Sequence, residues 1–443
     1  MRIQLPEKVN RIIQTLQDHG HEAYAVGGCV RDSILGRVPD DWDITTSALP
    51  EETKELFART FDTGIEHGTI TVVMDKDAFE VTTYRVDGKY EDSRHPSEVT
   101  FTRSLKEDLL RRDFTINAMA YNDTDGLIDI FGGMEDLQAG IIRCVGDATA
   151  RFSEDALRIL RAVRFAAQLG FSIEESTKEG IRTLASNLAL ISAERIQVEL
   201  VKMLVSPNPE LLDMAYKLGI TKVILPEFDE MMATEQETPH HIYNVGEHTL
   251  KSIGFVPAEK VLRLTMLLHD VAKPLTKEID ENGKAHFHTH NEKGAELAKQ
   301  ILRRLKFDND TINTVYKLVL HHDLRIPATA RNVRRAMNRI GEELFPYYLM
   351  VQKADTLAQS EYKREEKLQN MEDVQAVYEE VLRRKECVSL KELAITGSDL
   401  IALGMEPGKE IGQMLSSLLE KVLEDPAYNT KEKLIEIVRE RMN

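Results

Sequence analysis

Residues 23–43 read AYAVGGCVRDSILGRVPDDWD, and this segment indicates how the N-terminal part of the chain folds. The run Ala23–Val26 predicts a short strand, and Gly27-Gly28 predicts a tight turn into a helix over 30–35. From residue 42 to about 129, runs rich in β-branched residues alternate with helical stretches. This alternation predicts an α+β head with a small mixed β-sheet and helices.

The same segment carries residue types that suit a nucleotide and a metal ion. Gly27 and Gly28 let the backbone approach a phosphate at a helix N-terminus, and Arg31 can hold a triphosphate through its forked donors. Asp41 and Asp43 face one side of a strand, where two carboxylates suit Mg²⁺ and a two-metal reaction. A tight turn and a solvated strand end are the structural alternatives, which the closeness of the two features makes less favoured.

Further polar residues extend this pattern. Glu80, on a later predicted strand, could supply a third carboxylate or simply face solvent. Arg111-Arg112-Asp113 precedes an apolar helix start, where the residues either cap the helix or hold a nucleotide. The helix after Ser153 is expected to bury one stripe of side chains, namely Ala156, Ile159, Leu160, Val163 and Ala167.

Asp155, Arg158 and Arg161 span an arc of roughly 120° on the other side of that helix, with Arg164 at its edge. They could form surface ion pairs, with Ser153 as the helix cap. They could instead read a base, because a carboxylate accepts from the amino group of cytosine or adenine and a guanidinium donates to the ring acceptor. Uracil and guanine present the opposite pattern, so discrimination could reach about 1–3 kcal/mol.

From about residue 136 onward, helical periodicity replaces the strands, which divides the chain into four predicted parts. A head over 1–135 is followed by an all-α neck over 136–230, a histidine-rich helical body over 231–360 and a helical tail over 361–443. Nine of the thirteen histidines lie between His240 and His322. Imidazoles and carboxylates bind divalent transition metals, and a bound metal lowers the pKa of water for hydrolysis.

Composition sets the class of protein. The 57 Lys+Arg and 74 Asp+Glu give a net charge of −17, which by itself argues against nucleic-acid binding, although the clustered arginines can form a local positive site. No apolar run is long enough for a membrane span, and the N-terminus does not resemble a signal peptide. Three scattered cysteines do not form a disulfide framework. We therefore expect a cytoplasmic protein without a membrane partner.

Several motifs in one order resemble the class II tRNA nucleotidyltransferases, which include the CCA-adding enzymes and bacterial poly(A) polymerases. The matching stretches are Gly27–Asp32 with Asp41–Asp43, Gly64–Thr69, Arg111–Ala118, Glu154–Arg158 and Ser192–Ile196.

The resemblance implies a reaction and a set of roles. The 3′-hydroxyl of tRNA would attack the α-phosphate of CTP or ATP and release pyrophosphate, with Mg²⁺ held by the catalytic residues Asp41 and Asp43. The implied nucleotide-binding residues are Gly28, Arg31, Arg112, Asp155, Arg158, Arg161 and Arg164.

Other stretches bear on the subtype. Residues 84–96 match a loop that CC-only members lack, and Gly64–Thr69 resembles the CCA-adding branch more than the poly(A) branch. The tail stretch Ile395–Leu400, with Gly404 and Gly408-Lys409, also matches CCA-adding enzymes. The glycines there either hold tRNA phosphates at helix N-termini or cap the helices.

His269-Asp270-Val271-Ala272-Lys273 resembles the HD phosphohydrolase motif. The resemblance implies metal ligands at His248, His269, Asp270 and Asp355, a divalent transition metal, and a second-site ligand at His290 or His321. Such a body either cleaves phosphoesters, for example cyclic phosphates at RNA ends, or only supports the structure.

The leading hypothesis is template-independent CCA addition to tRNA, with an additional HD phosphohydrolase activity. The alternatives are an A-adding enzyme or poly(A) polymerase, or a protein that is mainly a metal-dependent HD phosphohydrolase. The sequence leaves the oligomeric state open.

Overall fold

A computed structural model describes residues 2–88 and 99–442 of the chain, which divides into two compact units, Met1–Pro226 and Glu227–Asn443. The predicted boundary at 230/231 lies close to this division. The predicted boundaries at 135/136 and 360/361 fall inside the units, and the four-part division remains a prediction.

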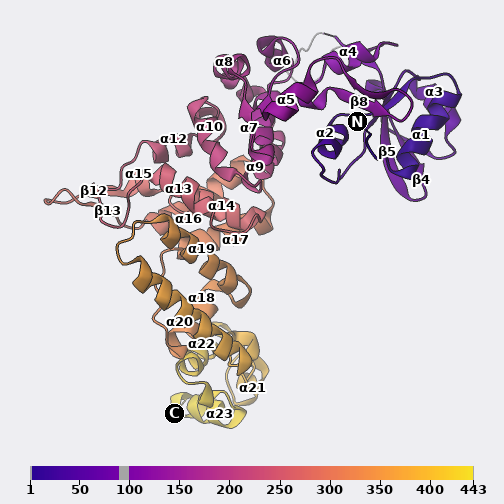
Figure 1. The fold of residues 1–443 in the computed structure, drawn as a ribbon. Coiled ribbons are helices and arrows are strands. Elements are labelled where there is room, and N and C mark those ends of the chain that lie inside the picture. Colours follow the sequence, from indigo (N-terminus) through magenta and orange to yellow (C-terminus); the bar gives the residue numbers. More distant parts are fainter. Residues whose placement is uncertain (1, 89–98, 443) are drawn as a thin grey trace. The chain divides into compact units, whose positions relative to one another are not determined.

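The first unit is built around a seven-stranded mixed sheet in the order β3-β4-β5-β2-β1-β8-β9 (Figure 1). Its strands are β1 (Ala23–Val26), β2 (Ile44–Thr46), β3 (Thr60–Gly64), β4 (Thr69–Met74), β5 (Asp77–Thr83), β8 (Met119–Asn122) and β9 (Gly126–Asp129). Strands β2 and β5 run parallel, and the other pairs of this sheet are antiparallel. The predicted α+β class and mixed sheet are confirmed. A separate hairpin pairs β6 (Arg85–Asp87) with β7 (Val99–Phe101).

The helices of the head are α1 (Glu7–Asp18), α2 (Gly28–Ile34), α3 (Pro50–Leu56), α4 (Leu105–Leu110) and α5 (Gly133–Ala139). Helix α1 buries Val9, Ile12, Ile13 and Leu16 at helical spacing against β1, β2 and α3. Helix α2 contacts β1 and β8, so the turn at Gly27-Gly28 is fixed at the end of the interior strand β1.

The remaining helices of the first unit are α6 (Ala148–Glu154), α7 (Leu157–Leu169), α8 (Glu175–Leu184), α9 (Ala193–Leu204), α10 (Leu212–Lys217) and α11 (Thr221–Ile224). Helix α7 packs against α9, and its predicted buried stripe is confirmed. The expected loss of strands after residue 136 is wrong in detail. Short pairs β10 (Ile141–Ile142) with β11 (Ser172–Ile173), and β12 (Lys277–Ile279) with β13 (Ala285–Phe287), occur where brief extended segments find a partner.

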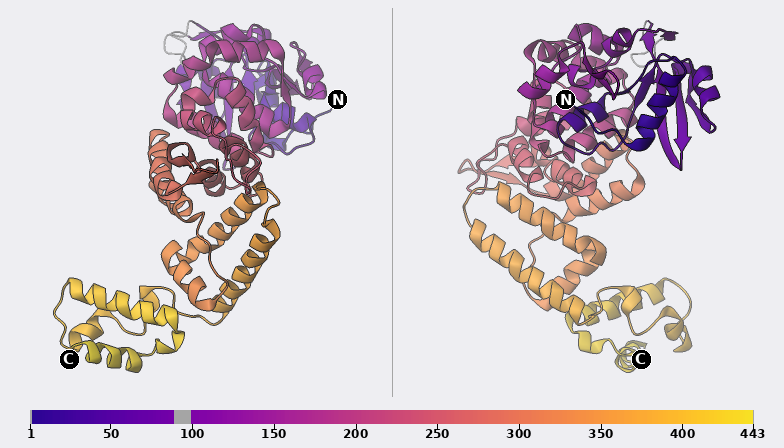
Figure 2. Two further views of the ribbon diagram at one scale, coloured as in Figure 1. Left: turned by 90° about the vertical axis from the view of Figure 1, so that its left-hand side faces the viewer. Right: turned by 45° about the vertical axis from the view of Figure 1, so that its right-hand side comes forward.

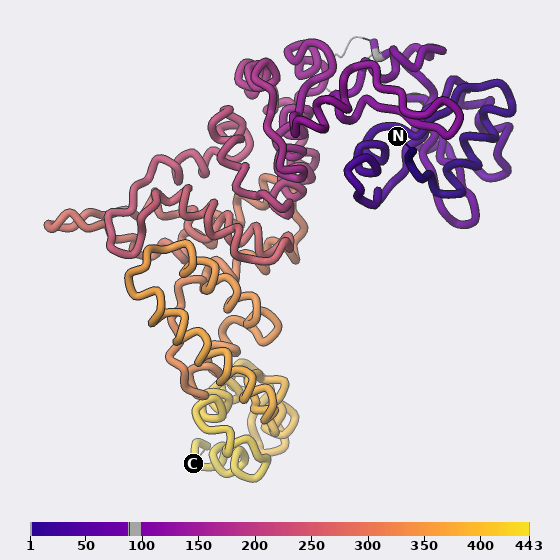
Figure 3. The backbone as a smooth tube through the Cα atoms, viewed as in Figure 1, coloured from indigo at the N-terminus to yellow at the C-terminus, as the bar shows by residue number. Residues whose placement is uncertain are grey.

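The second unit is helical apart from the β12–β13 hairpin, which extends away from the helices in the backbone trace (Figure 3). Its helices are α13 (Val245–Ile253), α14 (Lys260–Leu268), α15 (Lys273–Thr276), α16 (His290–Arg304), α17 (Asn309–His321), α18 (Ala330–Ile340), α19 (Phe345–Ala358), α20 (Arg364–Arg383), α21 (Gly397–Ala402), α22 (Lys409–Glu424) and α23 (Lys431–Met442), while α12 (Pro226–Met232) starts at the division. Helix α20 lies alongside α18 and α19 (Figure 2).

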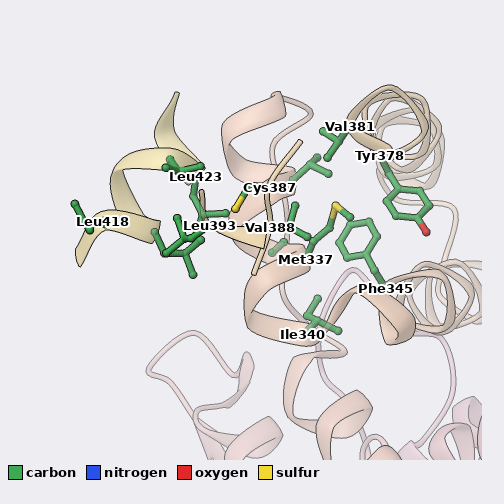
Figure 4. Close-up of a cluster of buried hydrophobic side chains, with 14 of the residues drawn as sticks. Met337, Ile340, Phe345, Tyr378, Val381, Cys387, Val388, Leu393, Leu418 and Leu423 are labelled. Atoms are coloured by element: carbon green, nitrogen blue, oxygen red, sulfur yellow. The ribbon is translucent and has the colours of Figure 1, made fainter. Parts of the chain in front are cut away.

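One hydrophobic cluster joins the end of the histidine-rich region to the tail (Figure 4). Met337 and Ile340 from α18 and Phe345 from α19 pack with Tyr378 from α20, and the cluster continues to Leu418 in α22. Burial of these side chains stabilises body and tail together. All three cysteines are free and buried. None of the described helices has the length and hydropathy needed to cross a membrane.

Candidate functional site

The Gly27-Gly28 turn lies beside an arginine. Gly27 adopts φ +85°, and a Cβ at this position would lie 3.0 Å from Arg112 Nη1. Both facts favour glycine here, because other residues strain this backbone and a side chain would push the guanidinium away. Helix α2 begins at Gly28, two residues before the predicted start at Val30.

Arg31 is buried rather than open to the cavity. Its Nη1 donates to Asn117 Oδ1 at 2.6 Å, and its Nε and Nη2 each donate to a carboxylate oxygen of Asp32 at 2.9 Å. The guanidinium also lies 4.9 Å from the centre of the Phe165 ring. These contacts fix the guanidinium in one position at the start of the α2 helix.

The two predicted metal-binding carboxylates precede a strand instead of lying on it. Strand β2 begins at Ile44, and the carbonyl of Asp43 accepts a hydrogen bond from Val26 N at 3.0 Å, which continues the pairing with β1 by one residue. Ile44 pairs with Val81 in the parallel β2–β5 ladder. The preceding residues, Asp43 and Glu80, are therefore neighbours across the two strands.

The carboxylates affect one another electrostatically. Although Asp43 keeps an exposed edge, the surrounding protein removes enough water to raise its pKa, and Asp41 adds to the rise while Arg112 opposes it. Burial, Asp43 and Asp41 likewise raise the pKa of Glu80. A bound cation would relieve this repulsion, so the donor set fits a divalent ion.

Asp113 anchors the arginine-rich wall of the site. Arg161 Nη2 lies 2.7 Å from Asp113 Oδ2, and Asn117 Nδ2 donates to Oδ1 at 3.0 Å. Burial alone would raise the pKa of Asp113, but Arg161 and Asn117 outweigh it and lower the pKa to about 2. Asp113 is therefore a carboxylate that holds Arg161 in place.

Asp155 does not lie in the same helix as Arg158, which corrects the expected single helix after Ser153. Helix α6 ends at Glu154, and Ser153 is inside it with its hydroxyl donating to Thr149 O. Asp155 lies at the break before α7, where Oδ1 accepts from Leu157 N at 3.0 Å and Oδ2 accepts from Arg195 Nη2 at 2.7 Å.

The other two arginines of α7 are also paired within the protein. Arg158 Nη1 donates to Glu154 Oε2 at 2.6 Å, and its Nη2 donates to the carbonyl of Arg111 at 2.8 Å. Arg164 forms an ion pair of 2.6 Å with the buried Glu199, and burial lowers its pKa to about 10. The alternative of an Asp155–Arg158 ion pair is replaced by these separate pairs, because the helix is interrupted between Glu154 and Leu157.

One cavity of about 270 Å³ collects most of the predicted nucleotide-binding residues. Its lining is Arg111, Arg112, Asp113, Asp155, Leu157, Arg158, Arg161 and Arg195. Gly28, Arg31 and Arg164 are not among the lining residues. Arg112 Nε and Arg195 Nη1 are buried without a hydrogen-bond partner among the described residues, so each of these two lining arginines has an unused donor.

Sequence reasoning gave no role to Arg195. It lies forty residues after Asp155 and on another helix, α9. The only signal was its place in the stretch Ser192–Ile196, which belongs to the motif series but does not by itself indicate a contact.

The structure describes only part of the predicted subtype loop, and it describes the tail stretch with its glycines. Residues 89–98 of the loop over 84–96 lie outside the described residues. In the tail, α21 begins at Gly397 after Thr396, whose hydroxyl accepts from Asp399 N, and Gly408 precedes α22. Thr396 thus caps α21, and phosphate binding at Gly397 remains a prediction.

The histidine-rich region of the second unit converges on Asp270. His248 Nε2 lies 2.8 Å from Asp355 Oδ1, and His269 Nε2 lies 3.2 Å from Asp270 Oδ2. Burial disfavours charge on His269, but Asp270 and Asp355 outweigh it and raise its pKa to about 10. All four predicted ligands are therefore brought together.

A second set of ligand atoms lies on the other oxygen of Asp270. His290 Nε2 and His322 Nε2 lie 3.8 Å and 3.6 Å from Asp270 Oδ1 and 3.3 Å from each other. His290 is as predicted, but the second residue is His322 and not His321. Successive residues at a helix end point about 100° apart, so only one of the pair can face Asp270.

Two three-residue groups thus share one carboxylate. His248, His269 and Asp270 form one, and Asp270, His290 and His322 form the other, each with ligand atoms within 4.8 Å of one another. Among the described residues, these two are the groups of three that meet this distance. The ligand atoms of the carboxylates in the head are therefore not gathered as closely.

In the first unit, Arg112 lines the arginine-rich cavity and also acts electrostatically on Asp43. Arginines that suit phosphate oxygens beside carboxylates that suit a divalent ion are the groups that nucleotidyl transfer requires. Family models agree: a poly A polymerase head domain matches residues 23–143, a probable RNA and SrmB-binding site of polymerase A matches 170–232, and a putative tRNA nucleotidyltransferase domain 2 matches 282–438.

The chain is 36% identical to a CCA-adding enzyme of Lactiplantibacillus plantarum over 97% of this chain and 94% of that one. It is also 36% identical to a CCA-adding enzyme of Enterococcus faecalis, over 97% and 95% of the two chains. The crystal structure of the Bacillus stearothermophilus CCA-adding enzyme in complex with CTP matches with a TM-score of 0.71 and 29% identity, covering 99% of this chain and 98% of that one. The chain belongs to the family of CCA-adding enzymes, which are tRNA nucleotidyltransferases.

Proposed function

We propose that this protein adds C and A nucleotides to the 3′ end of tRNA to give CCA, using CTP and ATP and releasing pyrophosphate. The observation that carries the proposal is the arginine-lined cavity of about 270 Å³. One of its lining residues, Arg112, also acts electrostatically on Asp43. Relatives of similar length are CCA-adding enzymes, and one of them binds CTP. This supports CCA addition over an A-adding enzyme or a poly(A) polymerase.

Asp41 and Asp43 would hold Mg²⁺, with Glu80 next to Asp43. The ion would supply charge neutralisation at the phosphate and activation of the attacking hydroxyl. The protein's own groups bind and orient the nucleotide. Arg112 and Arg195 each have a buried donor nitrogen without a partner, and an anionic or carbonyl acceptor on the nucleotide would satisfy both.

Asp155 and Arg158 would read the base from the same cavity. Arg195 holds one carboxylate oxygen of Asp155, which leaves free lone pairs to accept from the amino group of cytosine or adenine. The guanidinium of Arg158 already donates to Glu154, so contact with a base requires it to exchange a partner. A uracil ring would meet the Asp155 carboxylate with a carbonyl and be repelled.

A direct experiment offers the purified protein two tRNAs, one ending before CCA and one ending after CC. Each is incubated with CTP alone, ATP alone or both, and the products are resolved to single nucleotides. We expect CC from CTP alone on the first tRNA, A from ATP alone on the second, and CCA from both. Failure to add C would contradict CCA addition, and continued addition of A would favour a poly(A) polymerase.

We also propose that the second unit is a metal-dependent phosphohydrolase of the HD type. The supporting observation is that two groups of ligands share Asp270. Histidine nitrogens with carboxylate oxygens suit divalent transition metals, and such an ion would supply an activated water for attack on a phosphoester. His248, His269 and Asp355 would hold one ion with Asp270, and His290 with His322 would hold a second.

Metal content tests this second function without reference to activity. Apart from any ion held by Asp41 and Asp43, protein loaded with Mn²⁺ or Ni²⁺ and then desalted should retain up to two ions per chain, and Asp270→Ala should lose these two. His321→Ala is the matched control, because this buried histidine lies outside both groups. Equal metal content in Asp270→Ala and the unaltered protein would contradict the assignment.

A further inference from the structure

Phe165, a buried aromatic residue of α7, is contacted by three guanidinium groups. The guanidinium carbon of Arg164 lies over the ring, 3.7 Å from its centre. The guanidinium carbons of Arg31 and Arg161 lie over the ring at 4.9 Å and 5.3 Å from its centre. The face of an aromatic ring carries negative charge density and attracts a cation that lies above it. One uncharged side chain therefore attracts three cations.

The three arginines come from two helices of the first unit. Arg31 belongs to α2, and Arg161 and Arg164 belong to α7. Each arginine has a different acidic partner, in chain order Asp32, Asp113 and Glu199. The ring of Phe165 is a contact that all three have in common. It therefore connects the helix that follows the Gly27-Gly28 turn to the helix whose side chains line the arginine-rich cavity.

The arginines around this ring repel one another. Burial lowers the pKa of Arg164 to about 10, and the positive charges of Arg161 and Arg31 contribute to the fall, although Glu199 opposes it. The negative face of the ring offsets part of the repulsion without adding a net charge. A further carboxylate would offset it too, but would also occupy N–H donors that a nucleotide needs. An aromatic ring is therefore suited to this position.

A second aromatic residue fixes the orientation of the Phe165 ring. Phe114, which is fully buried, meets it edge to face, with the ring centres 5.9 Å apart and an angle of 82° between the ring planes. Phe114 directly follows Asp113, whose Oδ2 lies 2.7 Å from Arg161 Nη2. The segment that orients the ring therefore also holds Arg161 through its carboxylate.

We propose that Phe165 is a positioning residue for nucleotide binding, whose ring holds Arg161 in the wall of the arginine-lined cavity and connects this wall to Arg31 of α2. The inference deepens the proposed CCA addition and rests on it for the identity of the nucleotide. Phe165 is not among the lining residues, so it acts through Arg161, which is. Since Arg161 would contact the nucleotide before and during the reaction, loss of its position should raise KM and leave kcat unchanged.

Fluorinated phenylalanines in place of Phe165 test the inference in the full-length protein, because each added fluorine weakens the negative face of the ring and changes its size little. On a tRNA ending before CCA, the KM for CTP should rise with each fluorine, to about tenfold with three, while kcat stays within about twofold. The same series at Phe152, which is fully buried beside Gly180, is the matched control and should leave KM unchanged. Within the described part of the chain, no guanidinium lies over the ring of Phe152.

Phe165→Leu removes the aromatic face altogether and should raise the KM for CTP more than the fluorinated rings do. If the lost ring volume unfolds this variant, the fluorinated series still decides, because the ring is kept. A constant KM across the series at Phe165, equal rises at Phe165 and Phe152, or normal CTP binding by a folded Phe165→Leu variant would overturn the inference. An unaltered protein that adds neither C nor A would instead contradict the proposed function, so the two failures are distinguishable.

Discussion

The arginine-lined cavity of the first unit and the histidine cluster of the second both gather charged side chains, but they balance the charge differently. In the first, each lining arginine has an acidic partner: Arg111 and Arg112 with Asp108, Arg158 with Glu154, Arg161 with Asp113 and Arg195 with Asp155. In the second, Asp270 and Asp355 are shared among His248, His269, His290 and His322, and Lys273 also pairs with Asp270.

The difference teaches how each site is organised. Ion pairs hold the arginines of the first cavity in position before a nucleotide arrives, so little reorganisation is needed on binding except at Arg158, which has to exchange its partner Glu154. In the second site, histidine nitrogens and carboxylate oxygens that can all bind a metal ion lie close together. A metal ion with a phosphate would complete the charge balance. One site is preorganised by the protein, and the other is arranged for completion by its ligands.

The largest expected effect comes from removing one carboxylate from each site in turn and measuring both activities. Asp43→Ala should lower the rate of A addition to a tRNA ending in CC about 10³-fold or more, because metal binding at the head is lost. Its metal content in the second unit should be unchanged. Asp270→Ala should lose phosphoesterase activity and keep nucleotide addition. Single-turnover assays measure both, with Asp40→Ala as the neighbouring exposed control. Loss of both activities in either variant would show that the sites are not independent.

Removing a buried partner in the first unit should cost stability. Glu199→Ala leaves the buried Arg164 without its carboxylate and should lower the free energy of unfolding by about 3 kcal/mol. Urea unfolding followed by fluorescence of the single tryptophan, Trp42, reports on this unit. Glu175→Ala removes an exposed acid that also pairs with cations and should leave the midpoint unchanged. Equal shifts in the two variants would contradict the preorganised ion-pair wall.

Acid should weaken the same wall over a defined range. The pKa of Asp113 is about 2 in the folded protein against 3.8 ordinarily, so its contribution is fully present above about pH 4 and is lost as the pH falls to about 2. Asp113→Asn should therefore cost about 2 kcal/mol at neutral pH and almost nothing at pH 2. Trp42 fluorescence at several pH values measures the difference. A constant difference would contradict the assignment, and the exposed Asp18→Asn serves as control.

The smallest expected effect is on base selection. Arg195→Ala frees the carboxylate of Asp155, and the preference for CTP over UTP should fall about tenfold. Competition between the two nucleotides on a tRNA ending before CCA measures this preference. Arg195→Lys keeps a charge near Asp155 and should restore part of the preference. Unchanged selectivity in Arg195→Ala would show that Asp155 is oriented without this contact.

Much of the fold follows from local patterns. The strand at Ala23–Val26 and the buried stripe of α7 were predictable, since both depend on the pattern of apolar residues along one short stretch of chain. The helix break at Asp155 was not predictable from periodicity, because the helical pattern of apolar residues continues through it although the helix is interrupted there. Strand pairs β10–β11 and β12–β13 were missed for a related reason, since two- or three-residue strands carry little signal.

The sequence by itself determined the chemical types at each site: glycines before a helix, Asp41 and Asp43 two residues apart, and His269 next to Asp270. These depend only on neighbours along the chain. The tertiary structure alone decided the long-range pairs, namely Asp43 beside Glu80 through strand register, Arg195 on Asp155, and His322 rather than His321 facing Asp270. Register, helix breaks and side-chain direction are set by packing of distant segments, which residue spacing does not encode.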